Sequence, residues 1–328
     1  MKVKTLLKAA ALIGVIGLVI ILVQYQKVDV EFTGKAVYEK TDRLDVYFCP
    51  EEDCKGKIAE ELNKATESIH CAIYNVNEEE ILNPLKNKDL EIKLVTDKAN
   101  KNNLQGIKTI KNYNAQGLMH NKFCIIDNRT IIMGSYNPTI SEANNTNNIL
   151  IIKSRYLVEN YEEEFKELWN KEFGAGQKVK NPLIYLNNKR VENYFCPEDK
   201  CSGKVIKEIE KANESITFYT FSFTDGDISQ ALIKKHSEGI KVVGLIEKTQ
   251  RSDYDQYDEL KNGKIEVNWY EKKYKLHDKV FVVDEAIVIT GSYNPTENAD
   301  KRNDENIIII EDEKIAKEYL ERFNYLTS

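Results

Sequence analysis

The chain has 328 residues, of which 41% are hydrophobic, enough apolar side chains for one large domain or two modest ones. Its 53 acidic and 47 basic residues give a net charge of −6, which argues against a dedicated duplex-DNA-binding protein with a basic face. A basic cleft can still lie within an acidic protein, so the charge does not exclude a phosphate-containing ligand. The chain has four histidines, so any histidine in a repeated pattern is informative.

The N-terminal segment is apolar. Residues 9–23 carry no charge and follow three lysines, within a stretch of about 20 residues that matches the length of a membrane-spanning helix. No small-x-small peptidase site ends this stretch, so the sequence favours an uncleaved membrane anchor at residues 1–24 over a cleaved signal peptide. The preceding lysines predict a single-pass protein of the cell membrane, with a cytoplasmic N-terminus and residues 28–328 outside the cytoplasm.

The rest of the chain is an internal duplication. The sequence Tyr-Phe-Cys-Pro-Glu at 47–51 recurs at 194–198, and Gly-Ser-Tyr-Asn-Pro-Thr at 134–139 recurs at 291–296. The second copy carries an additional polar stretch at about 251–263. The repeats divide the chain after the anchor into a stalk at 25–44, a first half at 45–178, a linker at 179–189 and a second half at 190–328.

Strands and helices alternate within each half. In the first half the hydrophobic pattern predicts a helix at 57–66, strands at 68–76 and 91–96, a hairpin of 123–127 with 130–133, a strand at 148–153 and a closing amphipathic helix at 156–170. The second half repeats this order and ends in a helix at 315–326. The pattern predicts an α/β fold of two similar sheet-and-helix lobes packed against each other.

Each half contains His-x-Lys-x4-Asp just before its Gly-Ser-Tyr-Asn turn. The residues are His120, Lys122 and Asp127 in the first half and His277, Lys279 and Asp284 in the second. Alternate side chains of a strand share a face, so each histidine points the same way as the lysine of its own motif. An ammonium group can neutralise phosphate oxygens, and an imidazole can attack phosphorus or transfer a proton. The adjoining turns offer Ser135, Asn137, Ser292 and Asn294 as further phosphate-binding groups.

A single His-x-Lys pair on a strand is usually an exposed surface pair. Here the pair occurs twice with the same spacing to Asp and to the Gly-Ser turn, which favours a functional role. The other two histidines, His70 and His236, have no counterpart in the opposite half, so we expect them to be structural or surface residues.

His-x-Lys-x4-Asp followed by Gly-Ser-x-Asn, present twice over about residues 45–328, resembles the phospholipase D superfamily. Each half is most similar to its compact nucleases and mitochondrial cardiolipin hydrolases, which dimerise to unite two motifs, so this chain is expected to act as a monomer. The resemblance implies a phospholipase D-like sandwich of two halves related by a pseudo-twofold axis. It also implies a phosphodiesterase that needs no metal or cofactor, in which one histidine attacks phosphorus and the other protonates the leaving oxygen.

The two copies differ at one position of the family pattern. Members usually carry a carboxylate after Gly-Ser-x-Asn, and it orients the histidine of the opposite half. The second copy has Glu305, whereas the first has Asn147. By this pattern Glu305 orients His120, the predicted nucleophile, and Asn147 faces His277, the predicted proton donor. The alternative is that another carboxylate, such as Glu142, replaces the missing one.

The six cysteines form two groups. Cys49 with Cys54 and Cys196 with Cys201 occupy matching places, and outside the cytoplasm two local disulfides are the favoured interpretation, ahead of free thiols and of a four-cysteine zinc site. Cys71 and Cys124 lie in apolar strands, so we expect them to be unpaired core residues.

Three functions remain open from the sequence. A phospholipid phosphodiesterase fits an anchor that holds the site near a bilayer. A nuclease acting on DNA or RNA fits the compact relatives. A catalytically inactive, membrane-tethered binding protein is least favoured, because both motifs are intact.

Overall fold

The computed structural model describes residues 36–328, apart from 88 and 115. The predicted anchor at 1–24 and most of the predicted stalk lie outside the described residues. Within the described part of the chain, no helix has both the length and the hydropathy needed to cross a membrane.

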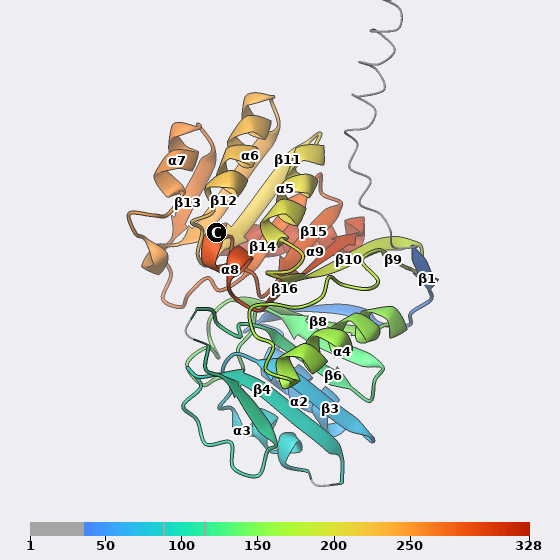
Figure 1. The fold of residues 1–328 in the computed structure, drawn as a ribbon. Helices are drawn as coiled ribbons and strands as arrows, with labels where there is room; N and C mark the ends of the chain where they lie inside the picture. The colour runs from blue at the N-terminus through green and yellow to red at the C-terminus, as the bar shows by residue number, and fades with distance from the viewer. Residues whose placement is uncertain (1–35, 88, 115) are drawn as a thin grey trace, which may run out of the picture. The chain divides into compact units, whose positions relative to one another are not determined.

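The described residues form two mixed β-sheets, one for each half (Figure 1). The seven-stranded sheet has the order β2-β8-β7-β6-β3-β4-β5. Its strands are β2 (Leu44–Cys49), β3 (Ser68–Ile73), β4 (Glu91–Asp97), β5 (Thr109–Asn112), β6 (Lys122–Ile126), β7 (Thr130–Gly134) and β8 (Asn147–Lys153).

The nine-stranded sheet repeats this arrangement and extends it by two short strands, in the order β1-β9-β10-β16-β15-β14-β11-β12-β13. Its strands are β1 (Val37–Glu39), β9 (Ile184–Leu186), β10 (Lys189–Cys196), β11 (Ser215–Thr220), β12 (Lys241–Glu247), β13 (Glu266–Tyr270), β14 (Lys279–Val283), β15 (Ile287–Gly291) and β16 (Glu305–Glu311).

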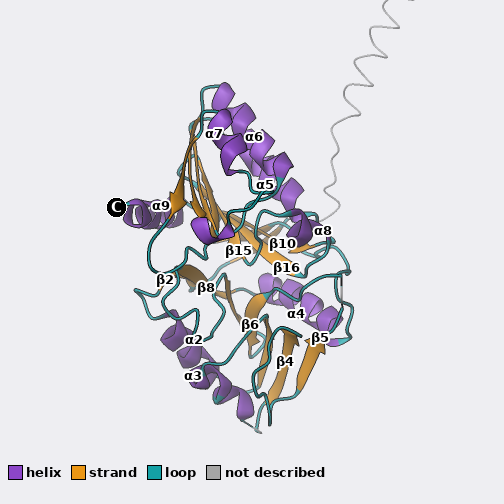
Figure 2. Cartoon of the chain, turned by 90° about the vertical axis from the view of Figure 1, so that its left-hand side faces the viewer, coloured by secondary structure: helices purple, strands orange, loops and turns teal. Residues whose placement is uncertain are grey.

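Helices cover both faces of each sheet (Figure 2). The seven-stranded sheet carries α2 (Cys54–Asn63) and α3 (Glu79–Leu82) on one face and α4 (Arg155–Trp169) on the other. The nine-stranded sheet carries α5 (Cys201–Lys211), α6 (Gly226–Ser237) and α7 (Tyr257–Asn262) on one face and α9 (Glu313–Thr327) on the other. The short elements η1 (Pro84–Lys86), η2 (Lys248–Gln250) and α8 (Glu297–Lys301) lie in connections.

The long helices α4 and α9 join the two halves. Each begins at a capping side chain, Ser154 for α4 and Asp312 for α9, that accepts a backbone N–H of the first turn. The ring of Tyr161 on α4 packs edge to face on Phe195 of β10, with ring centroids 5.0 Å apart. Tyr319 of α9 packs in the same way on Phe48 of β2, also with centroids 5.0 Å apart. Both helices contribute to one hydrophobic cluster with the inner faces of both sheets. Burial of this shared cluster holds the halves together, and thereby positions their motifs.

The elements predicted for the first half are all present in the predicted order, and most of their boundaries differ by one to three residues, but the prediction omitted β2, α3, η1 and β5. The predicted stalk and linker are not simple connections. β1, in the stalk, pairs in parallel with β9, in the linker, and β9 pairs with β10 of the second half. Both short strands therefore extend the second sheet, so the linker and the described part of the stalk contribute strands to it.

Three disulfides are present among the described residues. Cys49 is bonded to Cys54 and Cys196 to Cys201, each across the start of the first helix of its half. The prediction that Cys71 and Cys124 are unpaired is wrong, because these two residues are bonded to each other. They lie directly opposite each other on the antiparallel strands β3 and β6, so their side chains share a face.

Candidate active site between the two halves

The motif histidines lie at the boundary between the halves, just before β6 and β14. His120 donates its backbone N–H to Asp304 O at 3.0 Å, and His277 donates its backbone N–H to Thr146 O at 3.0 Å. Isolated bridges next to them pair Met119 with Asp304 and Thr146 with Leu276. Backbone hydrogen bonds to the opposite half therefore fix the position of each histidine.

The Nδ1 atom of each imidazole contacts a side chain of the opposite half. His120 Nδ1 lies 2.8 Å from Glu305 Oε2, and His277 Nδ1 lies 2.8 Å from Asn147 Oδ1. Glu305 and Asn147 are buried first residues of β16 and β8, at matching places in the two sheets. With Nδ1 occupied, Nε2 of each ring is the nitrogen left for chemistry.

The serines of the Gly-Ser turns hold these partner side chains. Ser292 donates its hydroxyl to Glu305 at 2.6 Å, and Ser135 donates its hydroxyl to Asn147 Oδ1 at 2.9 Å. The preceding glycine, Gly134, has a φ of +154°, and a Cβ there would lie 2.2 Å from the carbonyl oxygen of Asn148. The turn thus requires glycine, and its serine orients the histidine's partner, whereas we predicted a direct phosphate contact.

The motif lysines are buried beside the histidines. Lys122 and Lys279 each donate to the backbone carbonyl of the histidine of their own motif. Burial lowers the pKa of Lys122 to about 7 and that of Lys279 to about 8. Phosphate oxygens would stabilise both ammonium groups, since an anion nearby offsets the cost of burying positive charge.

The electrostatics of the two motifs are coupled. Burial lowers the pKa of His277 well below its usual value, and the positive charges of Lys279 and Lys122 lower it further. Burial also lowers the pKa of His120, against the stabilising charge of Glu305, and Lys279 adds to the lowering. Because each histidine is affected by the lysine of the other half, the two motifs form one site.

Aromatic rings support both histidines. Tyr74 packs edge to face on His120 at 4.9 Å, and Phe221 does the same on His277 at 4.8 Å. Each ring also lies 5.3 Å from the ammonium of the lysine of the same motif. Neither residue was predicted from the sequence, although their matching positions just after β3 and β11 were a signal.

Unlike the serines, the asparagines of the two Gly-Ser-Tyr-Asn turns have side-chain oxygens that bond to no protein group among the described residues. Within the described part of the chain, the side-chain oxygens of Asn137 and Asn294 are buried without a hydrogen-bond partner. Their predicted contact with phosphate therefore stays a prediction, one in which each amide would donate through its nitrogen.

The predicted catalytic role of Asp127 and Asp284 does not fit their placement. Each lies at the far end of the five-residue strand that follows its motif histidine, in a turn with φ of +51°. Asp127 accepts backbone N–H groups from residues 66–68, and Asp284 accepts those of 213–215. These carboxylates fix the turn before β3 and β11, which is a structural function.

The two remaining histidines lie outside the site, as predicted. His70 Nδ1 lies 2.9 Å from Glu162, and its ring stacks on Phe165. His236 Nδ1 lies 3.3 Å from the carbonyl oxygen of Ile240.

A group of carboxylates lies next to the first motif. Ligand oxygens of Glu164, Glu167 and Glu198 lie within 4.8 Å of one another, and Glu164 accepts a hydrogen bond from Asn121, between His120 and Lys122. Burial, together with the charge of Glu198, raises the pKa of Glu164 well above its usual value, and burial raises the pKa of Glu198 to about 7. A shared proton can therefore hold Glu164 and Glu198 together without a cation.

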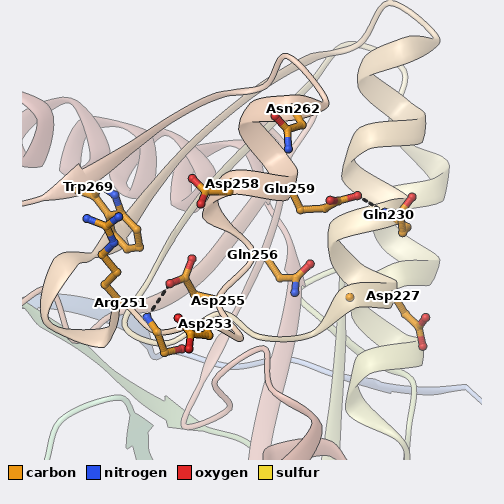
Figure 3. Close-up of a pocket in the computed structure, with 12 residues that line it drawn as sticks. Asp227, Gln230, Arg251, Asp253, Asp255, Gln256, Asp258, Glu259, Asn262 and Trp269 are labelled. Atoms are coloured by element: carbon orange, nitrogen blue, oxygen red, sulfur yellow. Dashed lines mark hydrogen bonds between the residues drawn. The ribbon is translucent and has the colours of Figure 1, made fainter.

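A separate pocket of about 870 Å³ lies in the second half, over the additional polar stretch (Figure 3). Asp253, Asp255 and Asp258 line it, and Gln230 donates to Glu259 across it at 2.9 Å. None of the predicted site residues lines this pocket. Most of the side chains that line it are exposed, so we interpret its acidic groups as part of the ordinary solvated surface.

Comparison with known proteins gives matches in both halves. The family described as "Cardiolipin synthase, PLD-like domain" matches residues 58–169 and 205–327. The chain is 37% identical over 139 residues to phospholipase D of Rickettsia prowazekii, covering 42% of this chain and 68% of that protein. It is 28% identical over 153 residues to mitochondrial cardiolipin hydrolase of Xenopus tropicalis, covering 44% of this chain and 69% of that protein. The solved phosphatidylserine synthase of Haemophilus influenzae has a similar fold, with a TM-score of 0.66, 13% identity and coverage of 88% and 87% of the two chains.

Proposed function

Because the chain belongs to the phospholipase D superfamily, we propose that it hydrolyses a phospholipid phosphodiester through a phosphohistidine intermediate, without a metal ion. The observation that carries the proposal is the single buried site in which His120 and His277 each depend on the opposite half. Both motifs are on one chain, so the enzyme would act as a monomer.

In the first step, Nε2 of His120 attacks phosphorus. The N–P bond forms as the P–O bond to the leaving alcohol breaks, and protonated His277 gives its Nε2 proton to that oxygen. The ring of His120 becomes cationic, and Glu305 at 2.8 Å stabilises this charge. The lysine ammonium groups stabilise the negative charge on the non-bridging oxygens.

In the second step, neutral His277 takes a proton from water as the water oxygen attacks phosphorus. The N–P bond breaks, and the electron pair returns to Nε2 of His120. The products are the free alcohol and a phosphomonoester, and both histidines regain their starting protonation states.

Two loops beside the site support a lipid substrate. Ile140, 70% exposed, lies on the turn after β7, and Lys275 of the loop before His277 donates its backbone N–H to Asn145 of that turn. This second loop exposes three lysines and Tyr274, which is 41% exposed. Exposed aliphatic and aromatic side chains beside lysines suit a bilayer interface with anionic head groups. A nucleobase could stack on Tyr274, but Ile140 offers no aromatic face, so this surface favours lipid over nucleic acid.

Purified full-length protein in mixed micelles tests this substrate assignment. In EDTA, we expect labelled phospholipid to be converted to phosphatidate at a rate about 10⁴-fold or more above that of the His277→Ala variant. Labelled single-stranded DNA should stay intact under the same conditions. Cleavage of the DNA without phosphatidate formation would establish the nuclease alternative, and the absence of both reactions would favour the inactive binding protein.

We also propose that the N-terminal segment anchors the chain with its catalytic part outside the cytoplasm. The three disulfides support this, because disulfides persist mainly in oxidising compartments. Protease added to cells stripped of any outer wall or membrane should degrade the catalytic part and leave a protected remnant from Met1 to near Lys27. A mature protein that begins near Tyr25 would indicate a cleaved signal peptide, and complete protection would indicate a cytoplasmic catalytic part.

A further inference from the structure

The two motif histidines have unequal partners. Glu305 supplies His120 with both a hydrogen-bond acceptor and a negative charge, whereas Asn147 supplies His277 with an acceptor alone. His277 is nevertheless surrounded by positive charge, since Lys279, Lys122 and Lys275 all act on it and His120 shares the site. A proton donor in this environment needs a compensating anion.

Glu142 is placed to supply that anion. Its Oε2 atom lies 3.7 Å from His277 Nδ1, which is too far for a hydrogen bond but within the range of strong Coulomb attraction. The side chain of Glu142 is mostly buried, with 22% of it exposed, so water screens the attraction less than at the surface.

The position of Glu142 is fixed by the turn that carries it. Asn145 donates its side-chain N–H to Glu142 Oε2 at 2.9 Å, and the backbone N–H of Glu142 bonds to Thr139 O at 3.0 Å. The side-chain oxygen of Asn145 in turn accepts the backbone N–H of Lys275, two residues before His277. This chain of contacts couples the turn of the first half directly to the second motif.

We propose that Glu142 is a positioning residue that stabilises the protonated form of His277, so that two residues of this chain do what one carboxylate does at His120. Asn147 fixes the ring and its tautomer, and Glu142 provides the negative charge. The mechanistic consequence rests on the proposed function, in which His277 is the proton donor, but the charge relation between Glu142 and His277 does not.

The same carboxylate acts on the lysines. The negative charge of Glu142 opposes the effect of burial on the pKa of Lys279, and it does the same for Lys122. Loss of this charge would therefore weaken both proton donation and phosphate binding on the alkaline side of the pH profile.

The test is the Glu142→Gln variant of the full-length protein, followed by NMR titration of its labelled imidazoles. Removing the carboxylate disfavours protonated His277, so its titration midpoint should fall by about one pH unit or more, while that of His120 stays nearly constant. With lipid substrate, the alkaline limb of kcat/KM should move to lower pH by a similar amount, with little change at the acid end. Adding Asn147→Asp to this variant should restore the midpoint of His277.

Two variants serve as controls. Glu271→Gln removes an exposed carboxylate paired with Lys248 at 2.6 Å and should leave both midpoints unchanged. Asn145→Ala keeps the Glu142 charge but removes its anchor, so a smaller shift in the same direction is expected. An unchanged His277 midpoint in Glu142→Gln, or an equal shift at His120, would overturn the proposal. Because the titration needs no substrate, this result is separable from a failure of the proposed function.

Discussion

Replacing either His120 or His277 with alanine should lower kcat/KM by about 10⁴-fold or more, and the double variant should be no less active than either single one. Both histidines act on one phosphorus atom, so removing either one stops turnover of a lipid whose leaving oxygen needs a proton. The shared burial of the two lysines and the reciprocal contacts with Glu305 and Asn147 are the physical basis of this expectation. Steady-state rates on the best lipid substrate measure it.

The matched control is His236→Ala. His236 is a half-buried histidine on α6 with a single weak contact to the carbonyl oxygen of Ile240, so its removal should leave turnover nearly unchanged. Thermal unfolding of all variants would show whether the fold is kept. Substantial turnover by one single variant, with loss in the other, would mean that the motifs do not form one catalytic unit.

The central residues of the site could be predicted because their motif occurs twice in the sequence. Two copies of His-x-Lys with the same spacing to a Gly-Ser turn identify the reacting groups without any knowledge of the fold. Glu305 of the second half contacts His120 of the first half, as the family pattern predicted. The period of hydrophobic residues gave the order of elements, since the strands of each sheet are largely buried.

Contacts that depend on how strands pair could not be predicted in the same way. Asp127 lies close to His120 in sequence but at the opposite end of a strand, because an extended chain rises about 3.3 Å per residue. Cys71 and Cys124 meet only because β6 inserts beside β3. In the second half the same position holds Phe218 opposite Phe281, so no second cysteine pair was there to reveal the bond.

A phosphohistidine should be found on His120 and not on His277. The Glu305 carboxylate hydrogen-bonds to Nδ1 of His120, which raises the nucleophilicity of Nε2 and supports the cationic phosphoimidazole. His277 has the neutral amide of Asn147 at the same place, so it is less able to support such a cation on its own ring. Glu305→Gln should accordingly lower kcat/KM by about 10²-fold or more, as loss of a charged partner does in other histidine-dependent sites.

The His277→Ala variant makes this intermediate observable. A p-nitrophenyl phosphodiester needs no proton donor to leave, so the variant should release one equivalent of nitrophenolate in a burst and then stop. Without His277 no group activates water, and the phosphoryl group should remain on His120, where mass analysis of peptides prepared at alkaline pH can locate it. His120→Ala should show neither burst nor label. A burst in His120→Ala with label on His277 would reverse the assignment, since His277 would then be the nucleophile and the Glu305 carboxylate would instead hold His120 as the proton donor.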